Sequence, residues 1–224
     1  MCGRFTLHTD GNQLATQFGV PELRRVTPRY NIAPGQPIAA LRHAAHGAAL
    51  THLRWGLVPS WAKDPTIGNR LINARAETVA EKPSFRAAFR RRRCLIPADG
   101  YYEWRVTPGG KQPCYIRAVE RTAFTFAGLW EHWQGADGSE LESGALITCA
   151  ANARLAKVHD RMPVVIAARD RAAWLDADLA VTELMPLLSP APEDAFDFAP
   201  VSRHVNSPLH DDPRCIEPVP DEVV

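Results

Sequence analysis

The 224-residue chain is poor in cysteine, and no pattern pairs the cysteines that it has. Their number is five, no two of them form a C-x-x-C pair, and none stands in a tight Cys/His cluster. This argues against a disulfide scaffold and against a structural zinc site. We therefore expect free thiols in a reducing compartment. No residue pattern indicates a metal ion or an organic cofactor.

Long apolar runs are also missing. The longest uncharged apolar stretches, such as GALITCAA, are far shorter than the ~18 residues that a membrane span needs. No charged segment followed by an apolar one stands near the start, so a secretory signal is not indicated. We expect a soluble, cytoplasmic protein with no membrane partner.

Charge is balanced overall but not along the chain. Residues 1–133 contain 19 Lys and Arg against 9 Asp and Glu, whereas residues 134–224 contain 7 against 16. Nearly all the basic residues are arginine, whose planar guanidinium group suits phosphate. Two interpretations stay open: the halves neutralise each other in the fold, or the arginines line a nucleic-acid-binding face.

The chain has no internal repeat, low-complexity segment or Gly/Ser linker, so one domain is expected. Short segments with strand character recur, and they cover residues 4–8, 37–43, 49–55, 94–106, 113–119, 123–133, 145–151, 162–167 and 198–205. Helical patterns are fewer and cover 11–19, 82–92, 151–159 and 170–177, the last with a continuation toward Leu188. The sequence predicts an α+β fold: a single compact domain with a bent, mainly antiparallel β-sheet and flanking short helices. We expect the domain at 1–206 and a C-terminal tail at 207–224 that is poorly ordered or lies on the surface.

Cys2 is the most unusual candidate for chemistry. Once Met1 is removed, Cys2 carries a free α-amine and a thiol on adjacent carbons. An α-amine has a pKa of ~7.8 against ~10.4 for lysine, so far more of it is nucleophilic at neutral pH. The amine can form an imine with an aldehyde, and the neighbouring thiol can then close a five-membered thiazolidine ring. The alternative is a chance cysteine at a frayed terminus.

Two further segments carry polar residues beside apolar ones. LINARAET contains Asn73, Arg75 and Glu77, and IPADGYYEW places Glu103 among aromatic residues, on the same face as Tyr101 if the segment is a strand. A carboxylate held against aromatic surface has a raised pKa, which suits proton transfer near neutral pH. The alternative is a glutamate on the solvent face of an edge strand.

His159 ends a predicted helix and precedes Asp160, which could orient its ring, and Arg161, which could hold an anion. The alternative is a helix cap or a core histidine. Trp61, beside Lys63, could stack on an unpaired base or belong to the core. The run Arg90 to Arg93 needs no function if it is a solvated helix end.

These segments together resemble one known family. MCGRF, RYNIAPGQ, RWGLVPSWAKD, LINARAET, RCLIPADGYYEW, ITCAAN, VHDRMPVVI and VSRHVN occur in the order found in the SOS-response-associated peptidase (SRAP) family, from Met1 to about Asn206. Members of that family shield abasic sites in single-stranded DNA. The resemblance implies a compact α+β fold with a positively charged groove, and a thiazolidine crosslink between the terminal cysteine and the ring-opened abasic sugar.

The resemblance also implies roles for individual residues. Cys2 matches the crosslinking cysteine, Asn73 the asparagine that positions it, Glu103 the catalytic carboxylate, and His159 the histidine that assists ring opening. The positions that match DNA-contacting residues are Arg4, Pro34, Trp61, Arg75, Thr148 and Arg161. Some members carry a second aromatic residue after the tryptophan that matches Trp61, and here that position is Ala62.

We therefore expect a protein that captures abasic sites in single-stranded DNA, works as a monomer in the cytoplasm and associates with the nucleoid when bound. Met1 is removed by the protein itself or by the host. DNA lyase activity and autopeptidase activity are further expectations. Two alternatives stay open. One is a thiol peptidase with Cys2 as nucleophile and His159 or Glu103 as base. The other is a non-covalent single-strand binder in which Cys2 is incidental.

Overall fold

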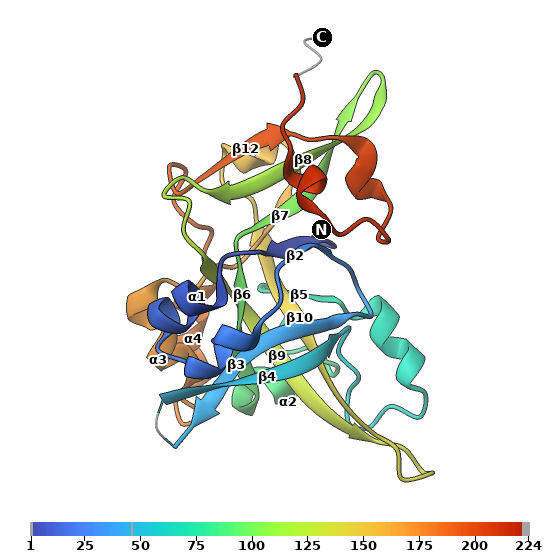
Figure 1. Cartoon of the computed structure of the whole chain (residues 1–224). Helices are drawn as coiled ribbons and strands as arrows, with labels where there is room; N and C mark the ends of the chain where they lie inside the picture. The colour runs from blue at the N-terminus through green and yellow to red at the C-terminus, as the bar shows by residue number, and fades with distance from the viewer. Residues whose placement is uncertain (1, 46, 221–224) are drawn as a thin grey trace.

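The fold is built from two β-sheets (Figure 1), in a computed structural model that describes residues 2–45 and 47–220. The five-stranded sheet has the order β12-β8-β7-β1-β2. Its strands are β1 (Phe5–Leu7), β2 (Arg29–Ile32), β7 (Gly100–Thr107), β8 (Gly110–Ala118) and β12 (Phe196–Pro200). All pairings in this sheet are antiparallel.

The second sheet closes on itself as a small barrel. Its strands are β3 (Pro37–Ala44), β4 (Gly47–Trp55), β5 (Asn73–Arg75), β6 (Arg93–Ala98), β9 (Phe124–Gln134), β10 (Glu140–Ala150) and β11 (Arg161–Pro163). β10 pairs with β9 on one side and with β4 on the other, which completes the ring β10-β4-β3-β6-β9. β10 pairs in parallel with β4 and β5, whereas the remaining pairings are antiparallel.

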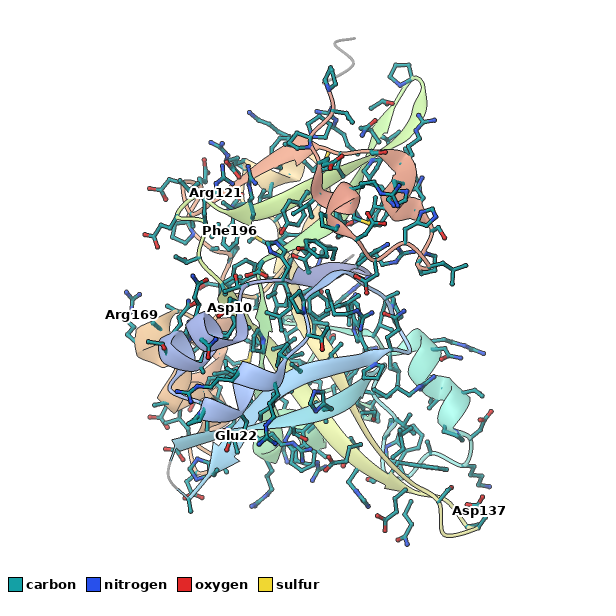
Figure 2. The ribbon with its side chains drawn as sticks, viewed as in Figure 1. Asp10, Glu22, Arg121, Asp137, Arg169 and Phe196 are labelled. Atoms are coloured by element: carbon teal, nitrogen blue, oxygen red, sulfur yellow. The ribbon has the colours of Figure 1, made fainter. Side chains whose placement is uncertain are left out.

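Short helices flank the sheets. The α-helices are α1 (Gly11–Phe18), α2 (Arg86–Arg91), α3 (Arg171–Leu175) and α4 (Val181–Leu184). The 3₁₀ turns are η1 (Pro21–Arg25), η2 (Pro65–Arg70), η3 (Leu155–Lys157), η4 (Ala168–Asp170), η5 (Met185–Leu188), η6 (Arg203–Asn206) and η7 (Pro213–Ile216). Figure 2 shows Asp10 and Arg169 on the helical side of the molecule, and Asp137 at the tip of the β9–β10 hairpin.

β1 lies against the aromatic core that joins the two sheets. The ring of Phe5 packs edge-on against Trp55 of β4, at 5.2 Å, and against Phe126 of β9, at 5.8 Å. Cys2, just before β1, is fully buried in the same core. The alternative of a frayed cysteine is therefore wrong, because Cys2 is packed in the core.

The α+β fold with a mainly antiparallel sheet is confirmed, and three details differ from expectation. The bent sheet is two sheets, one of them closed. The helix predicted at 151–159 is only the 3₁₀ turn η3, so His159 does not end a helix. The helix predicted at 82–92 ends at Arg91, and the buried Arg93 belongs to β6 rather than to a solvated helix end.

The segment after η6 packs onto the five-stranded sheet, as the red ribbon near β2 in Figure 1 shows. The carboxylate of Asp211 accepts hydrogen bonds from the backbone amides of Tyr30 and Asn31 and pairs with Arg29. Cys215 is fully buried beside Tyr102 and Tyr115. Within residues 2–45 and 47–220, no helix has the length and apolar character needed to cross a bilayer.

Candidate active site around Cys2

Asn73 fixes the backbone of Cys2. Its side-chain nitrogen Nδ2 donates a 2.7 Å hydrogen bond to the carbonyl oxygen of Cys2. Asn73 itself is held by β5, which lies parallel to β10 with Asn73 opposite Leu146. Two segments about 70 positions apart in the sequence thus meet at one backbone group. This contact places the α-carbon of Cys2, and with it both groups of the prospective aminothiol.

The Cys2 thiol lies in an environment that disfavours its ionised form. Burial raises the pKa of the thiol well above its usual range, and the charge of Glu103 acts in the same direction. The thiol is in van der Waals range of the carbonyl oxygen of Arg4, at 3.9 Å, which is a weak S–H···O contact. Cys2 therefore keeps its thiol proton at neutral pH unless a neighbouring group takes it or stabilises the thiolate.

Glu103 is enclosed rather than exposed. It lies on β7, opposite Cys114 of β8, and only 3% of its surface is accessible. The alternative of an edge-strand glutamate on a solvent face is wrong, because β7 lies between β8 and β1. Burial raises the pKa of Glu103, and the nearby His159 partly opposes that rise. A carboxyl group of this kind can hold a proton closer to neutral pH than an exposed one can.

His159 has two contacts at the same ring nitrogen. Nδ1 accepts a 3.0 Å hydrogen bond from the backbone amide of Arg161, and it lies 2.8 Å from a carboxylate oxygen of Asp160. The first contact needs a lone pair on Nδ1, whereas the second needs a proton there. The amide always carries its hydrogen and Asp160 is 86% exposed, so we assign the lone pair to Nδ1. The proton of the neutral ring is then on Nε2.

A hollow of about 500 Å³ opens beside these groups. Its lining contains the carboxyl-bearing Glu103, the imidazole of His159 and the ammonium group of Lys111, together with Trp104 and Asn206. The indole nitrogen of Trp104 donates a 2.8 Å hydrogen bond to Asn206 Oδ1. A larger cavity of about 850 Å³ lies elsewhere, between residues 118–124, 165–171 and 186–196, and none of the site residues predicted from the sequence lines it.

The three predicted phosphate-contacting arginines have different surroundings. Arg75 is exposed. The guanidinium group of Arg4 is half-buried and donates to Asn31 Oδ1 (2.9 Å) and to the carbonyl oxygens of Val205 (2.8 Å) and Asn206 (3.2 Å). Arg4 therefore ties the first strand to the C-terminal segment.

Arg161 forms a two-point ion pair with the carboxylate of Glu77 and also donates to the carbonyl oxygen of Thr148 at 2.6 Å. The Glu77 side chain is half exposed. A phosphate that reached Arg161 would have to share or displace that carboxylate. Of the three arginines, only Arg75 is exposed to solvent in this structure.

The remaining residues that were predicted to contact DNA differ in their exposure to solvent. Trp61 is 58% exposed, so it is not a core tryptophan. Pro34 is also exposed, in the turn that follows β2. Thr148 is fully buried on β10. Ala62 is buried, and its carbonyl oxygen accepts a 2.6 Å hydrogen bond from the indole of Trp133, which anchors the loop that carries Trp61.

Lys111 and Asn206 were missed as site residues. Lys111 belongs to no motif, and Asn206 ends the segment VSRHVN, which carries the family resemblance but no predicted chemistry. The two residues come from β8 and η6, far from Cys2 in the sequence. Only the pairing of β7 with β8 and the return of the C-terminal segment bring them to Glu103. Sequence reasoning had no signal for either of these juxtapositions.

One group of potential metal ligands lies outside this site. The ligand atoms of His204, Asp212 and Cys215 are within 4.8 Å of one another, so the expectation of no tight Cys/His cluster needs correction. Their separation along the sequence concealed the cluster. Each already has a hydrogen-bonding partner. His204 Nε2 lies 3.0 Å from Asp212, the Arg214 guanidinium lies 2.8 Å from the same carboxylate, and the Cys215 thiol contacts a backbone carbonyl. The arrangement is explained without an ion.

Comparisons with known proteins agree with this geometry. The family model described as "SOS response associated peptidase (SRAP)" matches residues 1–208. The abasic site processing protein YoqW of Bacillus subtilis is 40% identical over 222 residues, which cover 97% of this chain and 99% of YoqW. The abasic site processing protein HMCES of Gallus gallus is 33% identical over 228 residues, which cover 87% of this chain and 67% of HMCES.

Solved structures give the same result. A crystal structure of a protein from Bacteroides thetaiotaomicron has a TM-score of 0.87 and 25% identity, covering 97% of this chain and all of that one. A phage-related protein from Bordetella bronchiseptica has a TM-score of 0.70 and 30% identity, covering 89% of this chain and 94% of that one. The resemblance noted in the motifs is confirmed over nearly the whole length, and the chain belongs to the SOS response associated peptidase (SRAP) family.

Proposed function

We propose that this protein captures abasic sites in single-stranded DNA through a covalent thiazolidine link between Cys2 and the ring-opened sugar. The observation that carries the proposal is the hydrogen bond from Asn73 to the backbone of Cys2, a residue whose thiol feels the charge of the buried carboxyl group of Glu103. A buried cysteine whose backbone carbonyl group is fixed by a hydrogen bond is positioned for chemistry at its amine as well as at its sulfur. Relatives of this chain are named abasic site processing proteins, which supports the ring-opened abasic sugar as the aldehyde that Cys2 captures.

The reaction needs Met1 to be removed, by the protein itself or by a host aminopeptidase; Met1 lies outside the described residues. His159 and Glu103 then assist opening of the sugar to its aldehyde. The α-amine attacks the aldehyde carbon, a C–N bond forms, and water leaves with a proton supplied by Glu103. The Cys2 sulfur next bonds to the imine carbon while its proton passes to the nitrogen. The products are one thiazolidine and one water, and each step is reversible.

The burial of Cys2 favours this order over a general thiol peptidase. A peptidase needs a thiolate as its attacking group, and burial keeps the Cys2 thiol protonated. In the proposed order the neutral amine attacks first, and the sulfur reacts only with an imine already held beside it. Any peptidase activity is then limited to the release of Met1, where the protein itself removes it.

The imine intermediate also permits strand cleavage. An imine at the former aldehyde carbon acidifies the neighbouring C–H, so the phosphate on the 3′ side can leave by elimination. Closure of the thiazolidine ring consumes the imine and suppresses this path. DNA lyase activity is therefore proposed as a side reaction that increases when the sulfur is removed.

Two exposed side chains suit a single strand. Trp61 is exposed for stacking on a base, and Arg75 is exposed for a phosphate. Neither contact reads base sequence, which suits a lesion that has lost its base. We propose that the protein acts as a monomer in the cytoplasm and associates with the nucleoid when bound to DNA.

Intact-mass spectrometry after incubation with abasic single-stranded DNA tests the proposal. The expected product has the mass of protein lacking Met1 plus DNA minus one water, and it survives denaturation and high salt. Cys2→Ser should leave an imine that borohydride traps and should increase strand cleavage. A variant with extra residues before Cys2 should bind DNA normally but form no adduct. Normal adduct formation by the extended variant would contradict the mechanism, and complexes that salt dissociates would indicate a non-covalent binder.

A further inference from the structure

Tyr101 carries a buried hydroxyl group that the fold does not use. The residue is 1% exposed, and within residues 2–45 and 47–220 its hydroxyl oxygen has no hydrogen-bond partner. The neighbouring buried tyrosines differ. The Tyr102 hydroxyl donates to the carbonyl oxygen of Tyr30 at 2.6 Å, and the Tyr115 hydroxyl lies 2.8 Å from the hydroxyl of Thr6. A buried polar group without a partner costs stability, and such groups concentrate where function requires them.

The position of Tyr101 relates it to the reacting cysteine. Tyr101 and Glu103 alternate on β7 and so face the same side of the sheet. Tyr101 pairs with Phe5 of β1, the strand that begins just after Cys2, and Tyr101 and Cys2 belong to the same buried cluster. After burial itself, the charge of a Cys2 thiolate is the largest influence on the Tyr101 hydroxyl, followed by those of Glu103 and Cys149.

Tyr101 keeps its hydroxyl hydrogen available for donation in these surroundings. Burial and the three neighbouring acidic groups hold the pKa of Tyr101 well above its ordinary value, so the phenol keeps its proton throughout the physiological range. The thiolate of Cys2 would be stabilised by such a donor. This thiolate is disfavoured by burial and by Glu103, and a hydrogen bond to the sulfur anion would offset part of that cost.

We propose that the Tyr101 hydroxyl donates a hydrogen bond to the Cys2 sulfur as its thiolate forms, and so promotes closure of the thiazolidine ring. The role in ring closure rests on the proposed function, whereas the hydrogen bond to sulfur does not. The sulfur electron pair forms the bond to the imine carbon, the thiol proton reaches the nitrogen through the Glu103 carboxylate, and Tyr101 keeps its own proton. Nothing is oxidised or reduced.

The first test measures the sulfur without DNA. Protein whose Met1 has been removed is treated with iodoacetamide over a range of pH, and modification of Cys2 is followed by peptide mass spectrometry. Tyr101→Phe removes only the oxygen and keeps the ring that packs on Phe126. It should slow alkylation at neutral pH by about tenfold to a hundredfold, the effect of losing a hydrogen bond to a charged group, and move the pH profile upward. The charge of Glu103 also acts on the sulfur, so the comparison is between variants that all retain Glu103.

Tyr102→Phe is the matched control. It removes a buried hydroxyl from the next residue of the same strand, on the opposite face and bonded to Tyr30. Its Cys2 alkylation profile should match that of the unmodified protein. Tyr101→3-fluorotyrosine gives a second arm, since its more acidic hydroxyl is a stronger donor of nearly the same size. It should speed alkylation, and it keeps the test decisive if Tyr101→Phe folds poorly.

The second test uses abasic single-stranded DNA. Tyr101→Phe should trap with borohydride at the normal rate but close the ring about tenfold to a hundredfold more slowly. If no protein crosslinks while alkylation still separates Tyr101→Phe from Tyr102→Phe, the proposed function fails and the contact to sulfur stands. Equal alkylation profiles and equal closure rates for the two phenylalanine variants would overturn the inference.

Discussion

The buried carboxyl group of Glu103 lowers the stability of the folded protein at neutral pH. Its folded-state pKa is raised by burial, so the folded state holds a proton that the unfolded chain has already released. Stability must therefore fall as pH rises from the unfolded pKa, about 4.3, through the raised folded value. Above that window the full cost of burying the charge is present.

Glu103→Gln should consequently stabilise the protein at neutral pH, by about 0.5–2 kcal/mol, while slowing crosslinking by about 10²–10⁴-fold. The gain in stability should disappear in acid, below the unfolded pKa. Chemical denaturation at a series of pH values measures the first effect, and the rate of adduct formation measures the second. A variant that is destabilised at pH 7 would contradict the assigned sign.

Glu142→Gln provides a control of opposite sign. A hydrogen bond from Arg42 lowers the pKa of Glu142, so this carboxylate contributes stability above its unfolded pKa and loses it as pH falls. The Gln variant should be slightly destabilised at neutral pH and unchanged in acid. Its crosslinking rate should be normal, since Glu142 lies on β10 away from the pocket.

Trp61 should matter for DNA and not for folding. Because 58% of the Trp61 surface is exposed, Trp61→Ala should leave the melting temperature nearly unchanged. It should weaken binding to single-stranded DNA by about 1–3 kcal/mol if one base stacks on the indole. Fluorescence anisotropy with a labelled oligonucleotide measures this loss. Leu209→Ala, at a 90% exposed apolar residue, is the control and should bind normally.

At the scale of elements, Arg93 shows how a charged residue can organise a fold. Its guanidinium group donates to the carbonyl oxygens of Phe89 and Arg90 at the end of α2, and to those of Trp174 and Asp176 at the end of α3. The side chain thus closes two helices against β6. The cation also lies at helix C-termini, where positive charge is favourable.

Arg93→Ala should therefore lower the free energy of unfolding by about 3 kcal/mol or more, because four carbonyl groups, two of them in buried hydrogen bonds and two in part-buried ones, lose their donor. Arg91→Ala, at an exposed neighbour, should change it by less than about 0.5 kcal/mol. Urea denaturation of the two variants measures the difference. Equal stabilities would show that the four hydrogen bonds contribute nothing net.

The elements also show what could be predicted from sequence. Alternation along residues 101–104 correctly placed Glu103 and Tyr101 on one face, because side chains in a strand alternate strictly. The contact between Asn73 and Cys2 depends on β5 lying parallel to β10, a long-range pairing with no local signal. Only resemblance to a family suggested it. Closure of the barrel was missed for the same reason, and His159 was placed on a helix that the Asn152–Pro163 segment does not form.

At the scale of the whole molecule, the charge asymmetry is partly neutralised. Arginines of the basic half form ion pairs with carboxylates of the acidic half: Arg29 with Asp211, Arg42 with Glu142, and both Arg117 and Arg121 with Asp197. The first interpretation of the asymmetry, neutralisation within the fold, therefore holds in part, and the second, a nucleic-acid-binding face, stays a prediction. Composition cannot tell which arginines are paired, and so it overstates the basic surface available to DNA.

The C-terminal segment should be needed for stability. A chain that ends at Asn206 loses Asp211, which accepts from two backbone amides of β2, and Cys215, which fills the cluster around Tyr102. We expect the truncated chain to melt at least about 10 °C lower, in line with a loss of several kcal/mol. Asp211→Asn should have a smaller effect in the same direction. An unchanged melting temperature would show that residues 207–224 are a separable tail.

The bonds from Arg4 to Val205 and Asn206 have a consequence for the order of events in the cell. During synthesis, Cys2 leaves the ribosome about 200 residues before these two carbonyl groups are made. The strand that follows Cys2 can therefore be fastened to them only after residues 205 and 206 have been translated. A chain that ends before Val205 would lack both bonds, and we expect it to hold Arg4 less firmly.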